Sequence, residues 1–208
     1  MTTEAYEQMY KIADKHWWFI GKGEIVEQAI RQNLPKSDNV KLLDAGCGFG
    51  NMLKRYEKYG EAYGFEFSEK AIELTNKDNP RVKQGALPDK IPFENGQFDI
   101  VTSLDVLEHV DEDKQSADAL LKLLKPNGTL IVTVPAYMSH WSNHDVALHH
   151  KRRYTKKTLL ALFDLSPSSN LKLVKITHFN SFLCPPIYVF RKLKKIFMPN
   201  AVTTDDKL

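Results

Sequence analysis

The chain has 208 residues, of which 42% are hydrophobic and 26% are charged, with a formal net charge of +3. This composition suits a globular domain with a buried core, and the charge is too small to indicate nucleic-acid binding by itself. The two cysteines, Cys47 and Cys184, lie in unrelated contexts, so we expect no disulfide framework and a reducing, cytoplasmic location. We find neither a signal-peptide pattern nor an apolar run of the ~18 residues that a membrane span needs.

Two helices are predicted at the N-terminus. Residues 4–15 and 22–33 carry apolar residues at helical spacing, and an aromatic segment, residues 16–19, joins them. Pro35 pushes the preceding residue out of the helical region, which ends the second helix. We therefore expect residues 1–35 to form an N-terminal helical cap.

Strands and helices alternate beyond residue 36. The predicted strands are 40–43, 62–65, 81–84, 98–103 and 129–134, and the predicted helices are 51–59, 69–77 and 112–124. Ser68 is the expected N-cap of the second of these helices. The alternation predicts an α/β fold, with a Rossmann-like, doubly wound, mostly parallel sheet covered by helices on both faces, over residues 36–180. Ligands of such sheets bind outside the carboxyl ends of the strands.

The C-terminal part differs from this pattern. Thr155 is the expected cap of a helix over 156–163, and residues 171–177 predict a further strand. Residues 181–208 form a basic amphipathic tail, which we expect to dock on the enzyme, on a second subunit or on an anionic membrane surface. A loosely ordered terminus is the alternative.

A glycine loop follows the first predicted strand. The segment LLDAGCGFG, residues 42–50, has three alternate glycines between a strand and a helix, which allows a ligand to lie against the backbone. A dinucleotide-binding loop would need glycine at position 51, where this chain has Asn51. Asp44 would also repel a pyrophosphate, so the loop favours a cationic or zwitterionic ligand. A nicotinamide-dependent oxidoreductase remains an alternative, and a glycine-rich turn without a ligand is another.

Glu66 ends the second predicted strand, where a carboxylate can accept the hydroxyl groups of a ribose. A surface glutamate without a ligand is the alternative. A third class of function, a non-catalytic nucleic-acid-binding module, depends on the basic run KRRYTKK at 151–157. No recognised RNA-binding motif accompanies that run.

Four motifs carry a family resemblance. LLDAGCGFGNML, YGFEFSEKAIE, LPDKIPFENGQFDIVTSLDVLEHVDE and LLKPNGTLIVTVPA follow one another along residues 40–135 in the order found in class I S-adenosylmethionine-dependent methyltransferases. The segment resembles the branch of small-molecule and quinone-biosynthesis O-methyltransferases. The resemblance implies S-adenosyl-L-methionine as cofactor, S-adenosyl-L-homocysteine as product and a small-molecule acceptor, with O- or N-methylation favoured over C-methylation.

The resemblance also implies site residues. Relatives use the first loop for the methionine part of the cofactor, the end of the second strand for the ribose and adenine, and the end of the fourth strand for the amino-acid group. Many have an Asp after the third strand, whereas this chain has Gln84-Gly85-Ala86-Leu87, so we expect backbone groups to recognise adenine. The implied cofactor residues are Asp44, Gly46, Gly48, Gly50, Glu66, Phe67, Ala86, Leu87, Leu104 and Asp105.

The aromatic segment and the end of the sheet raise two further expectations. Either core packing or a lid over the cofactor explains the aromatics, and we expect one Trp to pack and the other to line the pocket. Trp18 and Lys22 would then contact the cofactor, and Trp17, His109 and Arg153 the acceptor.

Relatives end the sheet with a seventh, antiparallel strand. Residues 187–190 are the only candidate for that strand, so we expect either a truncated chain or a strand supplied by a partner.

The segment WSNHDVALHHKRRY follows the fifth predicted strand, on the side of the cofactor methyl group. We expect His144 or His149 to act as a general base, because imidazole titrates near neutral pH. Asp145 would orient that histidine, and Arg153 would hold the acceptor or anchor the loop. A metal site is tempting, because His140 precedes these residues and a further histidine follows, but we expect none. A solvated loop is the other alternative.

Overall fold

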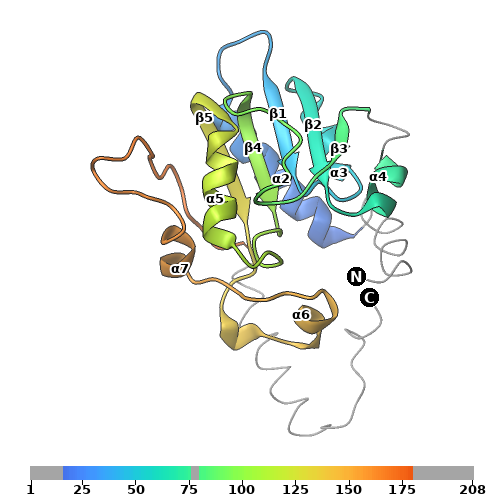
Figure 1. The fold of residues 1–208 in the computed structure, drawn as a ribbon, viewed down its shortest axis with the longest axis vertical. Coiled ribbons are helices and arrows are strands. Elements are labelled where there is room, and N and C mark those ends of the chain that lie inside the picture. Colours follow the sequence, from blue (N-terminus) through green and yellow to red (C-terminus); the bar gives the residue numbers. More distant parts are fainter. Residues whose placement is uncertain (1–15, 76–79, 180–208) are drawn as a thin grey trace, which may run out of the picture.

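The computed structural model describes residues 16–75 and 80–179, and it shows a sheet of five parallel strands in the order β3-β2-β1-β4-β5 (Figure 1). The predicted α/β, Rossmann-like fold is confirmed. The strands are β1 (Lys41–Ala45), β2 (Glu61–Glu66), β3 (Val82–Gln84), β4 (Phe98–Leu104) and β5 (Leu124–Thr133). The helices are α2 (Trp17–Asn33), α3 (Asn51–Tyr56), α4 (Glu69–Thr75), α5 (Asp113–Lys122), α6 (Asn143–Ala147) and α7 (Lys156–Leu160), with a 3-10 turn at Met138–His140.

The strand order places a ligand crevice beside β1. The chain runs outward from β1 to β2 and β3, and then returns to the other side of β1 with β4 and β5. Crossovers leave in opposite directions at such a point, so their loops separate beyond the carboxyl ends of the strands. Asp44 pairs in register with Gly64 on one side and Thr102 on the other. The loops after β1 and β4 therefore border the same crevice.

Neighbouring residues of β1 face opposite layers. Leu43 belongs to a core that includes Leu120 of α5, whereas Leu42 belongs to a second core with Ile30 of α2 and Leu53 of α3. All five side chains are fully or almost fully buried. The alternation follows from the period of two residues in a strand. Helices thus cover both faces, as predicted, and hold the strand ends in place.

The structure differs from the predicted elements at three places. Helix α2 begins at Trp17, so residues 17–19 are its first turn rather than a linker, and His16 caps it by accepting a hydrogen bond from the N–H of Trp18. The fifth strand, expected from residue 129, begins at Leu124 and includes Asn127, whose φ of 65° lies beside a register shift. Residues 171–177 form no strand, so β5 is an outer strand of the described sheet.

Several expectations lie outside the described residues. These are the helix over 4–15, the strand candidate at 187–190 and the tail at 181–208. Ser68 and Thr155 cap their helices as expected, because each hydroxyl accepts a backbone N–H of the first turn. In the described part of the chain, no helix has both the length and the apolar character that crossing a membrane requires.

Candidate active site

The three glycines of the loop after β1 all have positive φ, but they differ in what surrounds them. A Cβ atom on Gly46 would lie 2.6 Å from Val106, and one on Gly50 would lie 2.6 Å from Thr75, so packing excludes larger residues there. A Cβ atom on Gly48, whose φ is +51°, would meet nothing within 4 Å. Gly48 therefore borders open space in the pocket, as expected of a residue that lies against a ligand.

The carboxylate of Glu66 is fixed at the end of β2 by two backbone groups. Its Oε2 accepts the N–H of Gly48 at 3.0 Å, and its Oε1 accepts the N–H of Ser68 at 3.0 Å. Each carboxylate oxygen can accept a further hydrogen bond. Glu66 also lines the pocket, so it can receive the two hydroxyl groups of a ribose.

Asp44 lies at the end of β1 with only 3% of its surface exposed. Its Oδ1 accepts the hydroxyl of Thr102 at 2.6 Å, and Thr102 in turn accepts the hydroxyl of Tyr56 at 2.8 Å. Burial raises the pKa of Asp44 to about 6, although the hydrogen bond from Thr102 and the charge of Lys22 oppose the shift. A buried carboxylate of this kind favours a cationic ligand group.

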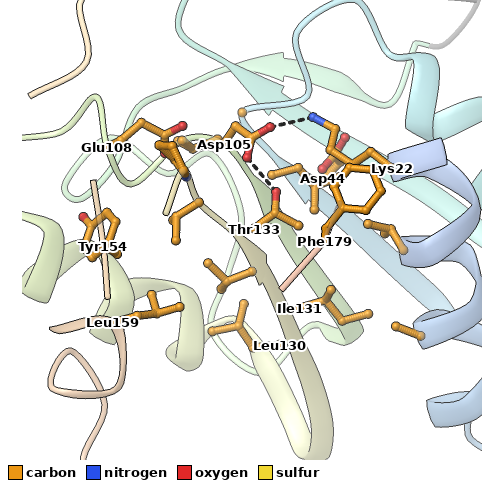
Figure 2. A pocket seen from close by; sticks show the side chains of 18 of the residues that line it. Lys22, Asp44, Asp105, Glu108, Leu130, Ile131, Thr133, Tyr154, Leu159 and Phe179 are labelled. Atoms are coloured by element: carbon orange, nitrogen blue, oxygen red, sulfur yellow. Dashed lines mark hydrogen bonds and ion pairs between the residues drawn. The ribbon is translucent and has the colours of Figure 1, made fainter. Parts of the chain in front are cut away.

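Lys22 reaches from α2 across the pocket to the loop after β4 (Figure 2). Its Nζ lies 2.7 Å from Oδ2 of Asp105, and Oδ1 of Asp105 accepts the hydroxyl of Thr133 at 2.9 Å. Burial would raise the pKa of Asp105, but Lys22 outweighs that effect and the pKa is lowered. We expected Lys22 at the carboxylate of the cofactor, whereas this structure pairs it with Asp105. Leu104, the preceding residue, lines the same pocket.

The adenine end is built by the segments that follow β2 and β3. Phe67 lines the pocket with 76% of its surface exposed. The N–H and the carbonyl of Ala86 both pair with Lys90. The N–H of Ala86 is thus already used, and the expected adenine contact stays with the other backbone groups of Ala86 and Leu87, which both line the pocket.

The first turn of α2 carries the tryptophans, and both line the pocket. Trp17 is 56% exposed and Trp18 is 37% exposed. The ring of Trp18 packs on Phe179, with 4.9 Å between centroids. We expected one tryptophan to pack and the other to line the pocket. Trp18 instead packs on Phe179 and lines the pocket at the same time.

Asp145 organises the segment after β5. Arg153 donates from Nε and a terminal nitrogen to both oxygens of Asp145, at 2.7 and 2.8 Å, and the N–H of Ser142 donates at 2.8 Å. Burial opposes ionisation of this fully buried group, but these hydrogen bonds hold its pKa well below the usual range. Arg153 therefore anchors the loop, one of the two roles we expected for it.

The histidine that Asp145 orients is His150, whose Nδ1 lies 2.9 Å from Oδ1. We expected His144 or His149 in this position. His149 is exposed and has a φ of 57°, and His144 is half-buried in α6. The left-handed residue reverses the chain so that the N–H of His150 donates to the carbonyl of Asp145 at 2.8 Å. This turn, which the sequence does not predict, brings His150 rather than His144 or His149 to Asp145.

Glu108 and His109 face His150 from the loop after β4. Glu108 is fully buried, and neither of its carboxyl oxygens has a hydrogen-bond partner in the described structure. Burial and the charge of Asp105 raise its pKa to about 9, and burial lowers the pKa of His109. One ligand atom from each of Glu108, His109 and His150 lies within 4.8 Å of the others. Within residues 16–75 and 80–179, this group alone has the spacing to hold a metal ion.

A family model described as a methyltransferase domain matches residues 43–132. A ubiquinone biosynthesis O-methyltransferase of Pelagibacter ubique is 23% identical over 211 residues, covering 84% of this chain and 86% of the relative. These matches support a class I S-adenosylmethionine-dependent methyltransferase. S-adenosylmethionine is its cofactor.

A Mycolicibacterium smegmatis protein named as an S-adenosylmethionine-dependent methyltransferase is 24% identical to this methyltransferase, over 74% of this chain and 60% of that protein. Six further curated relatives are matched over only 30–48% of their own length. The Bacillus subtilis protein YcgJ has the same fold, with a TM-score of 0.58 at 18% identity over 67% of this chain and 66% of that chain. Streptomyces venezuelae DesVI gives a TM-score of 0.56 at 18% identity, over 68% and 61%.

Proposed function

We propose that this methyltransferase transfers the methyl group of S-adenosylmethionine to an oxygen or nitrogen atom of a small molecule, with oxygen favoured. One observation carries the proposal. One pocket is lined both by Gly48 and Glu66, which follow β1 and end β2, and by His109 and His150. The first pair suits the nucleoside of the cofactor, and the two histidines offer the polar groups that an acceptor hydroxyl needs. The name of the Pelagibacter relative favours oxygen.

The cofactor would lie along the carboxyl ends of β2, β1 and β4. In this arrangement Glu66 accepts the ribose hydroxyls, while Asp44 and Asp105 attract the ammonium group of the methionine part. Phe67 would lie beside the adenine. The positive sulfonium would then point toward His109 and His150. Positioning supplies most of the rate enhancement, because the methyl group is already activated.

The first turn of α2 would act as a lid over this site. Trp17 and Trp18 border the pocket with large exposed surfaces, and Lys22 joins their helix to Asp105. Aromatic faces stabilise a nearby cation, and a lid excludes water during transfer. The described part of the cap that we expected from the sequence, residues 16–35, would thus cover the site.

The acceptor would be partly apolar and would not be a nucleic acid. Leu130, Ile131 and Leu159 line the pocket beyond Thr133 (Figure 2). The basic run at 151–157 is largely engaged within the protein. Lys151 pairs with Asp111, Arg152 with Asp113 and Arg153 with Asp145. These cations are therefore neutralised rather than presented to a phosphate backbone.

The proposal is tested by incubating the purified chain with S-adenosylmethionine and one acceptor at a time from a panel of phenols, catechols and amines. Mass spectrometry would measure both S-adenosylhomocysteine and the methylated product. We expect a phenol or catechol with an apolar substituent to be methylated on oxygen. Methylation confined to carbon, or to an RNA added as a further acceptor, would contradict the proposal.

A further inference from the structure

We propose that Glu108, His109 and His150 bind a divalent transition-metal cation of the zinc class at the acceptor end of the pocket. This departs from our expectation from the sequence that the protein holds no metal. The site stands on the geometry of these three side chains. Only its role in methyl transfer rests on the function proposed above.

The buried carboxyl group of Glu108 is the first observation. No part of this residue is exposed, and neither carboxyl oxygen has a hydrogen-bond partner in the described structure. Buried polar groups are nearly always paired, because an unpaired one loses its hydration without compensation. The segment that carries His150 is held against Glu108, since the N–H of Lys151 donates to the Glu108 carbonyl at 2.8 Å. The carboxyl group therefore faces a fixed partner segment with its ligand atoms unused.

The orientation of His150 is the second observation. Its Nδ1 is committed to Asp145 at 2.9 Å, and its Nε2 lies 4.0 Å from Oε1 of Glu108. Metal-binding histidines usually donate their other ring N–H to a carboxylate, which fixes the tautomer and the ring. Asp145 is itself held by Arg153 and Ser142. The outer shell of a metal site is thus complete around His150.

His109 supplies the third ligand. Its ring meets that of His150 edge to face, with 4.7 Å between centroids and 78° between planes. The ligand atoms of Glu108, His109 and His150 lie within 4.8 Å of one another. A tetrahedral zinc with bonds of about 2.1 Å needs ligand atoms roughly 3.4 Å apart. Small side-chain rotations toward the common centre would close the difference.

The ligand set indicates the class of cation. Two imidazole nitrogens and one carboxylate oxygen are ligands of catalytic zinc sites, in which a fourth position stays open. Imidazole favours zinc and its transition-metal neighbours over magnesium or calcium. Both histidines line the pocket, so the open position faces the acceptor.

A cation there would activate the acceptor. The acceptor hydroxyl oxygen binds the cation, which lowers the pKa of that hydroxyl group so that its proton leaves to solvent. The oxyanion then attacks the methyl carbon of the sulfonium. The new C–O bond forms as the C–S bond breaks, and the bonding pair stays on sulfur to give the neutral thioether of S-adenosylhomocysteine. No oxidant or reductant is required.

Zinc binding to the untagged full chain tests the site without knowledge of the acceptor. After removal of metals with a chelator, zinc would be titrated in competition with a chromophoric chelator, and the bound metal counted by elemental analysis. We expect one zinc per chain in the wild type. Binding should be lost in Glu108→Gln and in His150→Ala, and Asp145→Asn should weaken it about 10–100-fold. His178→Ala is the matched control, because His178 stacks on Tyr137 outside the cluster.

The site is overturned if Glu108→Gln and His150→Ala bind zinc as tightly as the wild type, or if the wild type binds none. A thermal melt of each variant checks that it is folded, and Glu108→Gln preserves the size of the buried side chain. S-adenosylhomocysteine binding is measured on the same samples. If the chain binds the cofactor but no zinc, the proposed metal site is overturned and the proposed function is unaffected. Zinc binding without cofactor binding supports the metal site and removes the proposed function.

Discussion

The main-chain N–H of Gly48 donates a 3.0 Å hydrogen bond to the carboxylate of Glu66. This contact joins the glycine loop after β1 to the end of β2, and both residues border the pocket. It places a backbone surface without a Cβ atom beside a fixed carboxylate. A nucleoside needs both features, one for close approach and one for its ribose hydroxyls.

Gly48→Val should abolish binding of S-adenosylhomocysteine and leave the fold largely intact, because the new side chain would enter open pocket space. Gly96→Val is the matched control. Gly96 also has a positive φ, +67°, and a Cβ atom there would likewise meet nothing within 4 Å. The control therefore carries similar backbone strain without touching the pocket. Calorimetry should show loss of binding only in the first variant, and equal loss in both would assign the effect to strain.

Glu66→Ala should weaken S-adenosylhomocysteine binding by roughly 1.5–3 kcal/mol, the contribution typical of hydrogen bonds to a charged group. Glu69→Ala is the control, because Glu69 is an exposed residue nearby whose described hydrogen bond is to Gln84. Isothermal titration of both variants gives the difference directly. An unchanged dissociation constant for Glu66→Ala would remove this residue from the ribose site.

The affinity for S-adenosylhomocysteine should fall as pH drops below about 6, where Asp44 takes up a proton. The ionised form attracts the ammonium group of the cofactor, so the loss is at most about tenfold per pH unit. The stability of the free protein changes with pH in the opposite direction to the affinity for the cofactor. Burial raises the pKa of Asp44 in the folded state above the ordinary pKa of an aspartate, about 3.9. The stability that this shift contributes is therefore fully present below the ordinary pKa and is lost as pH rises toward about 6.

Thr102→Val should move this loss of affinity to higher pH, because Thr102 donates the hydrogen bond that lowers the pKa of Asp44. Thr102→Ser keeps the hydroxyl and should restore the wild-type profile. Lys22 and Glu66 also act on Asp44 and are the same in both variants, whereas Tyr56 loses its hydrogen-bond acceptor only in the valine variant. Identical profiles for the valine and serine variants would show that the hydroxyl does not control Asp44.

Arg153→Ala should destabilise the protein by about 3–5 kcal/mol, the usual cost of removing one partner of a buried ion pair and leaving the other charge without compensation. Asp145, fully buried, would lose both hydrogen bonds from the guanidinium. Lys151→Ala is the control, since its pair with Asp111 is largely exposed and such pairs contribute about 0–1 kcal/mol. Denaturant unfolding should separate the two variants clearly. Comparable losses would mean that the pair with Asp145 does not hold the loop.

The sequence predicted the sheet well because its signals are local. Strands beginning near Lys41 and Phe98 are short apolar runs, and the glycine loop marks the turn that follows the first of them. Glu66 could be assigned because its position depends only on the end of a strand. These features need no knowledge of which distant segments meet.

The acceptor end was harder to predict because it depends on long-range contacts. Which histidine joins Asp145 is decided by a left-handed residue, His149, and by Arg153 eight positions later. Glu108 was overlooked, although LEHV follows β4, because only burial shows that its carboxyl group lacks a partner. Similarly, the sequence does not show that the N–H of Ala86, a residue expected at the adenine, pairs with Lys90.

Calorimetric titration of the wild-type chain with S-adenosylhomocysteine, NAD and a short single-stranded RNA, each in turn, decides between a methyltransferase, an oxidoreductase and a nucleic-acid-binding module. We expect one-to-one binding of S-adenosylhomocysteine that Gly48→Val abolishes, and no comparable binding of the other two. Tight binding of NAD or RNA with no heat from S-adenosylhomocysteine would contradict this expectation.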